Sequence, residues 1–420
     1  MARAFTAAIA WIERRAPVAA IGIIGLILAA GFTYSLHQGQ TLRYPDEEDY
    51  AAMATHLAEG RGFTLDGSHP TAFRPPAYPL FLGALRSAGA GVPLARCCQF
   101  AALALSMGMI YVLLRPVSPL AGVLGVAGVA AYPVAFYTAG VLYPQTLATT
   151  LLLATLLLLF RRKPLQARHF LLAGALLGIL ILLVPTFLFG LLVIAGWVSL
   201  REPRTGWRQA LLIGIAAGAT LLPWTVRNYT VFRSVVPIST NGGWNLLLGN
   251  SENTTPNAGV NVDITRYVAE THGMNEVEAD RHFTRAALRF MRQHPARAAT
   301  LYAGKFLNYF NYRNRLYVQS ESSRARDLAA LLTYGPLLLV AFGRILFRRR
   351  IPLTPFDRFA LAFYLLNAAY AAIFFTRIRF RLPFDFLLIC VCAGFLAKAA
   401  RPAGAGNARA GLGDAQKECQ

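Results

Sequence analysis

The sequence predicts an all-α polytopic membrane protein, a bundle of about ten transmembrane helices with two polar regions facing outward. The chain has 420 residues, of which 55% are hydrophobic and only 15% charged, whereas soluble domains carry roughly 25% charged residues. Apolar runs of about 17 to 25 residues recur along it, and a run of that length crosses the hydrocarbon core as a helix. Basic residues gather between alternate runs, as they do in cytoplasmic loops.

The first expected span covers residues 17–36, and the arginines before it place the N-terminus in the cytoplasm. Residues 37–96 then form the first outward region, and residues 225–327 form the second. Every turn assigned to the inner side is basic, so we expect both termini to be cytoplasmic. The later spans are expected to end near Leu114, Tyr137, Arg161, Pro185, Arg201, Trp224, Arg344, Thr376 and Lys398.

Residues 1–399 are expected to form one membrane domain, followed by a disordered cytoplasmic tail at residues 400–420 that is rich in Gly and Ala. The basic cluster at residues 161–163 is a strong marker of the inner side. Residues 299–310 are apolar and aromatic but too short to span the membrane comfortably. We expect an interfacial helix there, and whether residues 299–312 span the membrane stays open.

The net charge is +21, from 41 Lys and Arg against 20 Asp and Glu. In a soluble protein this excess would suggest nucleic acid, but here it follows the inner loops, so membrane lipids are expected as partners and nucleic acid is not. The five cysteines match neither a zinc site nor a disulfide framework, and we interpret them as packing residues.

Four acids follow Pro45 at the start of the first outward region: Asp46, Glu47, Glu48 and Asp49. Proline and acids suit the first turn of a helix, and Asp46, Asp49 and Tyr50 would share one face of it. Clustered carboxylates raise one another's pKa, which would let one of them accept a proton at neutral pH. Ordinary helix capping is the alternative, and by residue type alone it is the more frequent reason for acids here.

Arg74 precedes two prolines, which predicts an extended, rigid backbone at this arginine. A fixed guanidinium at a membrane surface suits a phosphate, although an anchor for lipid headgroups would use the same residue.

The second outward region carries two further patterns. The turn-forming stretch from Ser239 to Asn250 places Asn241, Trp244 and Asn245 together, and amides beside an aromatic ring are typical of sugar contacts; a structural turn is the alternative. A helix capped by Asn275 is expected to follow. Its basic stripe would meet lipid phosphates or, more commonly, solvent. The stripe consists of Arg281, Arg285, Arg289 and Arg292.

Five motifs on the outward side resemble, in their residues and in their order along the chain, those of membrane glycosyltransferases of the GT-C fold. The similarity is to bacterial family 39/83-like enzymes, which include protein mannosyltransferases and the aminoarabinose transferase of lipid A. The motifs are Asp46-Glu47 with Tyr50, Arg74-Pro75-Pro76 through Tyr78-Pro79, Pro223-Trp224 with Arg227-Asn228, Ser239 through Asn250, and Arg379-Phe380-Arg381-Leu382-Pro383.

The resemblance implies transfer of a sugar, with inversion, from a polyprenyl-phosphate donor to a lipid, glycan or protein acceptor on the periplasmic side of a bacterial inner membrane. It implies that Asp46 acts as general base or orients the acceptor, with Glu47 as the supporting acid. Arg74, Arg379 and Arg381 are the candidates for binding the donor phosphate. The candidates for contacting the rest of the substrate are Tyr50, Tyr78, Arg227, Asn241, Trp244 and Asn245.

The sequence departs from the family pattern at two positions. Gln145 stands in the second outer turn where many relatives carry an acid, which removes a potential metal ligand, so we expect no firm requirement for a metal or other cofactor. Asp49 stands where some relatives carry a basic residue, and we expect neither Glu48 nor Asp49 to take part directly.

A flippase or other transporter of lipid-linked sugars and a non-catalytic envelope-assembly protein are the alternatives. Transporters place polar groups at mid-membrane, often on broken helices, whereas the spans expected here are almost free of charge. The identities of the sugar and of the acceptor stay open, because the shape of the pocket sets both.

Overall fold

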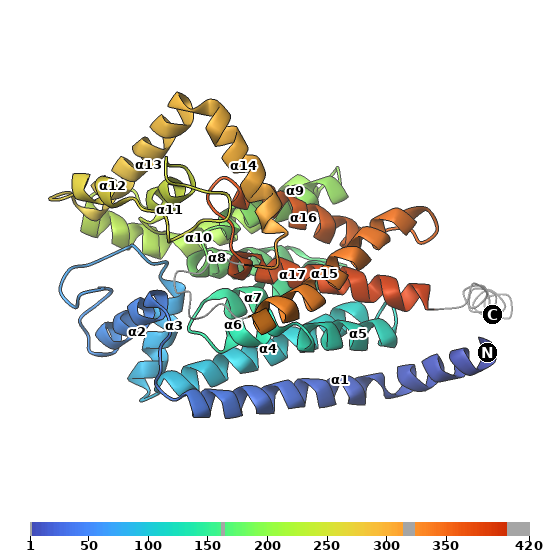
Figure 1. The fold of residues 1–420 in the computed structure, drawn as a ribbon. Coiled ribbons are helices and arrows are strands. Elements are labelled where there is room, and N and C mark those ends of the chain that lie inside the picture. Colours follow the sequence, from blue (N-terminus) through green and yellow to red (C-terminus); the bar gives the residue numbers. More distant parts are fainter. Residues whose placement is uncertain (1, 161–163, 314–323, 401–420) are drawn as a thin grey trace.

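The computed structural model describes residues 2–160, 164–313 and 324–400, and all of its regular structure in these ranges is helical. The prediction of an all-α polytopic membrane protein is confirmed. The basic cluster predicted to mark the inner side at 161–163 lies outside the described residues, as does the tail predicted at 400–420 except for Ala400. Long helices run side by side along one direction, and α1 begins at the same end of the bundle at which α17 finishes (Figure 1).

The bundle helices lie at the positions where spans are expected. They are α1 (Ala2–Gln38), α4 (Val92–Leu114), α5 (Pro119–Ala130), α6 (Pro133–Ala139), α7 (Gln145–Leu159), α8 (Ala167–Leu183), α9 (Phe187–Arg201), α10 (Gly206–Phe232), α15 (Arg324–Leu346), α16 (Pro355–Ala371) and α17 (Ile378–Ala399), with a short 3₁₀ turn (Phe347–Arg349) after α15.

Only part of this set meets the length and hydropathy of a full membrane span. Five helices do so: α1, α4, α10, α15 and α17. A sixth is added if α5 and α6, which are bent by 63° at Ala131–Tyr132, form one broken span. Helices α7, α8 and α9 are apolar but only 15 to 17 residues long. At 1.5 Å per residue they are shorter than the roughly 30 Å hydrocarbon core.

Helix α17 lies at the centre of the bundle. In its apolar window 89% of the residues are buried within the protein, against 11% for α10 and 17% for α1. The exposed side chains of the peripheral helices are apolar, as in Leu26 and Leu192, which suits contact with lipid. Gly174 and Gly178 let α8 approach α10 closely, because a Cβ at Gly174 would lie 2.3 Å from the carbonyl oxygen of Ile213.

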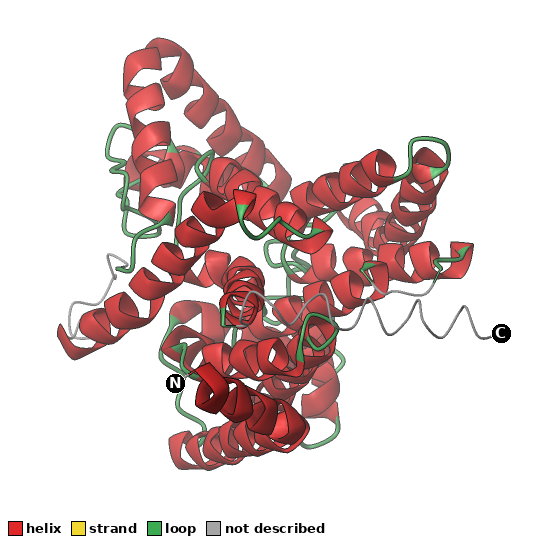
Figure 2. Ribbon diagram, turned by 90° about the vertical axis from the view of Figure 1, so that its right-hand side faces the viewer, coloured by secondary structure: helices red, strands yellow, loops and turns green. Residues whose placement is uncertain are grey.

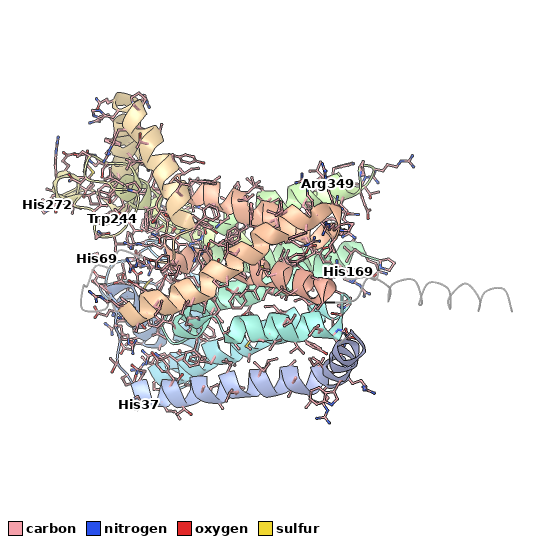
Figure 3. All side chains as sticks on the ribbon, turned by 45° about the vertical axis from the view of Figure 1, so that its right-hand side comes forward. His37, His69, His169, Trp244, His272 and Arg349 are labelled. Carbon is pink, nitrogen blue, oxygen red and sulfur yellow. The ribbon has the colours of Figure 1, made fainter. Side chains whose placement is uncertain are left out.

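A layer of shorter helices covers one end of the bundle, which we call the outer end. They are α2 (Pro45–Ala58), α3 (Ala77–Ser87), α11 (Gly242–Gly249), α12 (Thr265–Glu270), α13 (Glu276–Gln293) and α14 (Pro295–Tyr309). His37, His69, Trp244 and His272 mark this end in Figure 3, and His169 and Arg349 mark the opposite, inner end.

The two outward regions join into one layer through Glu276. Its carboxylate accepts hydrogen bonds from Thr71 Oγ1 at 2.7 Å and from the Ala72 amide at 2.8 Å, and the Thr240 hydroxyl also donates to it. The Thr240 amide in turn donates to the Ala72 carbonyl at 3.0 Å. The stretch that carries Arg74 is therefore fixed against the start of α11 and α13.

Helices α13 and α14 form a hairpin that stands out sideways from the bundle (Figures 1 and 2). The predicted cap at Asn275 is present, since its side chain accepts from the amides of Val277 and Glu278. The apolar segment expected to lie at the interface corresponds to α14, whose 15 residues are too few to cross the membrane.

Candidate functional site

Two aspartates and two arginines meet at the outer end of the bundle. Arg74 Nη2 donates to Asp46 Oδ1 at 2.7 Å and to Asp49 Oδ2 at 2.6 Å, and Arg379 Nη1 donates to Asp46 Oδ2 at 2.7 Å. The Asp46 carboxylate thus bridges two guanidinium groups, one on each oxygen. We call Asp46, Asp49, Arg74 and Arg379 the arginine–aspartate cluster.

Three separate segments supply this cluster, each for a local reason. Pro45 begins α2, so Asp46 and Asp49 lie about one helical turn apart on the same face. Arg74 stands on the constrained stretch before Pro75 and Pro76 that leads into α3. Arg379 lies in the first turn of α17 and reaches Asp46 across 333 positions of the sequence.

The electrostatics of Asp46 differ from the sequence-based expectation. Burial alone would raise the pKa of Asp46, but Arg379 and Arg74 outweigh burial and lower its pKa to about 2. The expectation that neighbouring acids raise this pKa is therefore wrong, because each carboxylate of the cluster faces an arginine rather than another acid. Burial would lower the pKa of Arg74, yet Tyr50, Asp46 and Asp49 raise it above its usual value.

Tyrosine rings border the cluster. The Arg379 guanidinium lies 4.5 Å from the centre of the Tyr143 ring, and the Arg74 guanidinium lies 5.4 Å from the centre of the Tyr50 ring. Burial raises the pKa of both tyrosines above the ordinary range, so both stay neutral. Tyr50, a predicted substrate contact, therefore borders the cluster, and Tyr143 is a neighbour that the sequence did not single out as a site residue.

Glu47 follows Asp46 in α2 and has a separate set of partners. Its side chain is fully buried and accepts hydrogen bonds from the amides of Arg43 and Leu142, both at 2.8 Å, with the Arg96 guanidinium 3.9 Å away. Glu47 thus ties the start of α2 to the turn between α6 and α7. Its hydrogen bonds and nearby guanidinium belong to residues outside the arginine–aspartate cluster, and the supporting role that the resemblance implies for it stays a prediction.

Asp49 belongs to the cluster through its ion pair with Arg74, and whether it takes part in the reaction stays a prediction. Both Nε and Nη2 of Arg74 donate to it. Glu48 is exposed and lies outside this set of contacts. The phase of the helix explains the difference, because residues three apart share a face of α2 and adjacent residues do not.

Arg381 lies in the core and does not join Arg379 in the cluster. It is 1% exposed, donates through Nε to Asp385 at 3.0 Å and through Nη1 to the carbonyl oxygens of Tyr309 and Asn311. In this structure Arg381 is occupied by protein partners, and its expected role at the donor phosphate stays a prediction. The prediction of spans almost free of charge is wrong for α17, because this helix buries the charged pair Arg381 and Asp385. Tyr132 and Tyr364 donate hydrogen bonds to Asp385.

Tyr78 is also a core residue. Its side chain is completely buried, and its hydroxyl donates to Gln99 Oε1 at 2.9 Å. The Gln99 amide then donates to the carbonyl oxygens of Ala139 and Val141. Tyr78 therefore supports Tyr50, whose ring it meets edge to face at 4.9 Å, and does not itself line the cluster.

The other predicted substrate contacts lie in the second outward region. Arg227 donates to the carbonyl oxygens of Thr71 and Phe63 and stacks 4.8 Å from the Trp224 ring, so it fastens this region to the loop before Arg74. Asn241 and Asn245 are half-buried at the start of α11, and Trp244 beside them packs edge to face on Phe283 of α13.

Thr240, next to Asn241, is bonded to Ala72, two residues before Arg74. The turn that carries Asn241, Trp244 and Asn245 therefore adjoins the stretch that carries Arg74. Within the described ranges, no three His, Cys, Asp or Glu side chains gather as a group that could hold a metal ion.

No protein-family model matches the chain, and no curated protein matches it. Two solved structures are similar: crystal structures of ArnT from Cupriavidus metallidurans, one bound to undecaprenyl phosphate and one in the apo state. The first is 15% identical over 90% of this chain and 78% of that chain, with a TM-score of 0.42. The second is 14% identical over 91% and 76%, with a TM-score of 0.41.

Proposed function

We propose that this chain is an inverting membrane glycosyltransferase of the GT-C type, with residues 1–399 as its single membrane domain. It moves a sugar from a polyprenyl-phosphate donor to a lipid, glycan or protein acceptor at the periplasmic face of a bacterial inner membrane. The observation that carries the proposal is the Asp46 carboxylate held between Arg74 and Arg379 at 2.7 Å on each side. This arrangement supplies an anion-binding pair and a carboxylate in one place.

The two arginines suit a phosphate. Guanidinium groups bind phosphate with paired, charge-assisted hydrogen bonds, and such bonds stabilise the charge that a leaving phosphate gains. The Nε atom of Arg379 is buried and has no hydrogen-bond partner among the described residues, so a phosphate that displaced its neighbours would satisfy this donor. Arg379 lies in the first turn of α17, at the outer end of the bundle, where we expect the phosphate of a lipid-linked donor to bind.

The chemical step needs a base and a stabilised leaving group. An acceptor hydroxyl attacks the anomeric carbon on the side opposite the phosphate, and the new C–O bond forms as the bond to the phosphate oxygen breaks. The phosphate keeps the electron pair of the broken bond and is stabilised by Arg74 and Arg379. Asp46 orients the hydroxyl and takes its proton. Attack from the opposite side inverts the configuration at the anomeric carbon.

The low pKa of Asp46 fits this scheme only if the arginines change partners. With both guanidinium groups on its oxygens, Asp46 is a weak base, because its pKa is about 2. When a donor phosphate draws Arg74 and Arg379 away, the two charges that lower this pKa are shared with the phosphate, and the basicity of Asp46 rises. Donor binding would thereby make Asp46 a stronger base, so that Asp46 accepts a proton only when the donor is bound.

A lipid-sugar flippase is the second candidate, and one observation favours it. The buried Arg381–Asp385 pair in α17 and the broken pair α5 and α6 are features that transporters use at mid-membrane. Against it, the pair is already bonded to tyrosine hydroxyls and backbone carbonyls, which suits a fixed structural role.

Asp46→Asn tests the proposed activity. The amide keeps the size of the side chain but cannot take a proton, so we expect transfer from a polyprenyl-phosphate sugar to fall by about 10²- to 10⁴-fold with normal yield in the membrane. Glu48→Gln is the matched control, because Glu48 is exposed and adjacent in sequence. An Asp46→Asn protein with full transferase activity would refute the role of Asp46. Loss of donor translocation in this variant, without any transferase activity in the wild type, would support the flippase.

A further inference from the structure

Helix α13 carries a stripe of arginines that the proposed reaction does not use: Arg281, Arg285, Arg289 and Arg292. All four are exposed. At about 100° per residue they fall within an arc of roughly 80° on the helix surface. The residues that pack α13 against the protein, among them Phe283, Ala287 and Phe290, lie on the opposite side. The stripe is therefore the free face of this helix.

Among the described residues, no ion pair joins the stripe to an acid, and Asp280 interacts with Arg281 only without forming an ion pair. The acids of α13 itself are engaged in other contacts. Glu276 binds Thr71 and Ala72, Glu278 caps the helix, and Asp280 accepts from the Gly243 amide at 2.6 Å. Four like charges in a row that form no ion pair with the described acids favour an anionic partner.

The position of α13 points to the membrane as the source of that partner. The α13–α14 hairpin stands out sideways across the direction of the bundle helices, at its outer end (Figures 1 and 2). The exposed side of α14 carries apolar residues, including Tyr302 and Leu307, the latter 70% exposed. An apolar helix face at this level suits the boundary between headgroups and acyl chains. Arg289 and Arg292 lie next to the turn that joins α13 to α14.

We propose that the arginine stripe of α13 binds the phosphate groups of anionic lipid headgroups in the outer leaflet, so that the hairpin is a membrane-docking arm. Arginine suits this role because its planar guanidinium binds a phosphate through two hydrogen bonds. Each basic residue near an anionic surface adds to the attraction, and four act together here. The inference goes beyond the proposed activity and does not depend on it.

Hydrogen–deuterium exchange of α13 in lipid nanodiscs tests the arm directly. The full chain is placed in discs of zwitterionic phospholipid alone or with phosphatidylglycerol added. We expect the amides of residues 281–293 to exchange about tenfold more slowly in the anionic discs, and high salt to remove the difference. A variant with Arg281→Gln, Arg285→Gln, Arg289→Gln and Arg292→Gln should exchange at the faster rate in both kinds of disc.

A charge-matched control removes four other exposed arginines of the outer loops and helix ends: Arg61→Gln, Arg86→Gln, Arg233→Gln and Arg266→Gln. The control should keep the lipid-dependent protection. Equal exchange of wild-type α13 in both discs would overturn the proposal, as would equal loss of protection in the control. Protection by soluble polyphosphate in zwitterionic discs, without any effect of phosphatidylglycerol, would assign the stripe to a soluble anion and also overturn it. Each of these results is independent of transferase activity.

Discussion

Helix α17 carries two arginine–aspartate contacts only two residues apart, and they differ in what they can do. Arg379 meets Asp46 at the outer end, where the Asp46 side chain is 21% exposed and the Arg379 Nε atom has no partner among the described residues. Arg381 meets Asp385 in the core, where both are almost fully buried and the carboxylate also accepts from two tyrosines. The Arg379–Asp46 pair can thus exchange a partner for a ligand, whereas the Arg381–Asp385 pair is held in place by other protein groups.

This difference separates function from structure within a single helix. An ion pair with a spare donor and access to solvent can exchange its partner for a ligand. A buried pair with its donors and acceptors used inside the protein has no such freedom, and loss of one member leaves an unpaired charge in the core. We therefore propose that Arg379 belongs to the site and that Arg381 supports it.

Asp385→Asn should have the largest effect on stability. Arg381 would remain charged in the core without its carboxylate, and we expect a loss of about 3–5 kcal/mol in the free energy of unfolding. Thermal unfolding in detergent measures this loss. The double variant Arg381→Met with Asp385→Leu should recover most of it, because it removes both charges together. If Asp385→Asn unfolds like the wild type, the pair is not the structural element described here.

Acid should weaken the arginine–aspartate cluster by protonating Asp46. The pKa of Asp46 is lowered from 3.8 to about 2, so its contribution to stability is fully present above about pH 4 and disappears as the pH falls through 2. The shift corresponds to about 2 kcal/mol. Unfolding measured between pH 7 and pH 2 should show this loss, and Asp46→Asn should remove it. A wild-type profile that Asp46→Asn leaves unchanged would contradict the ion pairing.

The sequence predicts the helices well and the side-chain partners poorly, for a physical reason. Apolar runs and Pro45 are local signals, and the expected spans and the start of α2 follow from them. The pKa of Asp46 depends on Arg379, which is 333 positions away, so the acids nearby in the sequence predict the wrong direction. Helical phase places Asp49 on the same face as Asp46, one turn later, whereas the preference for Glu47 comes from the family resemblance.

Arg381 illustrates the same limit. Arg379 and Arg381 belong to one motif and look equivalent in the sequence, yet they lie on different sides of the first turn of α17. Only the packing of α14 and α16 against this helix, through the carbonyl of Tyr309 and the hydroxyl of Tyr364, decides which arginine is buried.

Glu47→Gln should have the smallest effect of this set and separates positioning from catalysis. The amide can accept only one of the two backbone hydrogen bonds that Glu47 holds, from Arg43 and Leu142, so we expect a loss of about 1 kcal/mol in stability. Transfer should persist, and its pH profile should match that of the wild type. A folded Glu47→Gln protein without activity would instead support the catalytic role that the family resemblance implies.

The exchange of partners at the outer cluster is the central claim, and the affinity of the purified protein for a polyprenyl phosphate tests it most directly. The wild type is compared with Asp46→Asn and Arg379→Gln, with Arg266→Gln as a control for loss of one exposed positive charge. Arg379→Gln should bind about tenfold or more weakly, because it lacks one charge-assisted contact. Asp46→Asn should bind at least as tightly as the wild type, because both arginines are then free for the phosphate. Unchanged binding by Arg379→Gln together with weaker binding by Asp46→Asn would contradict the account.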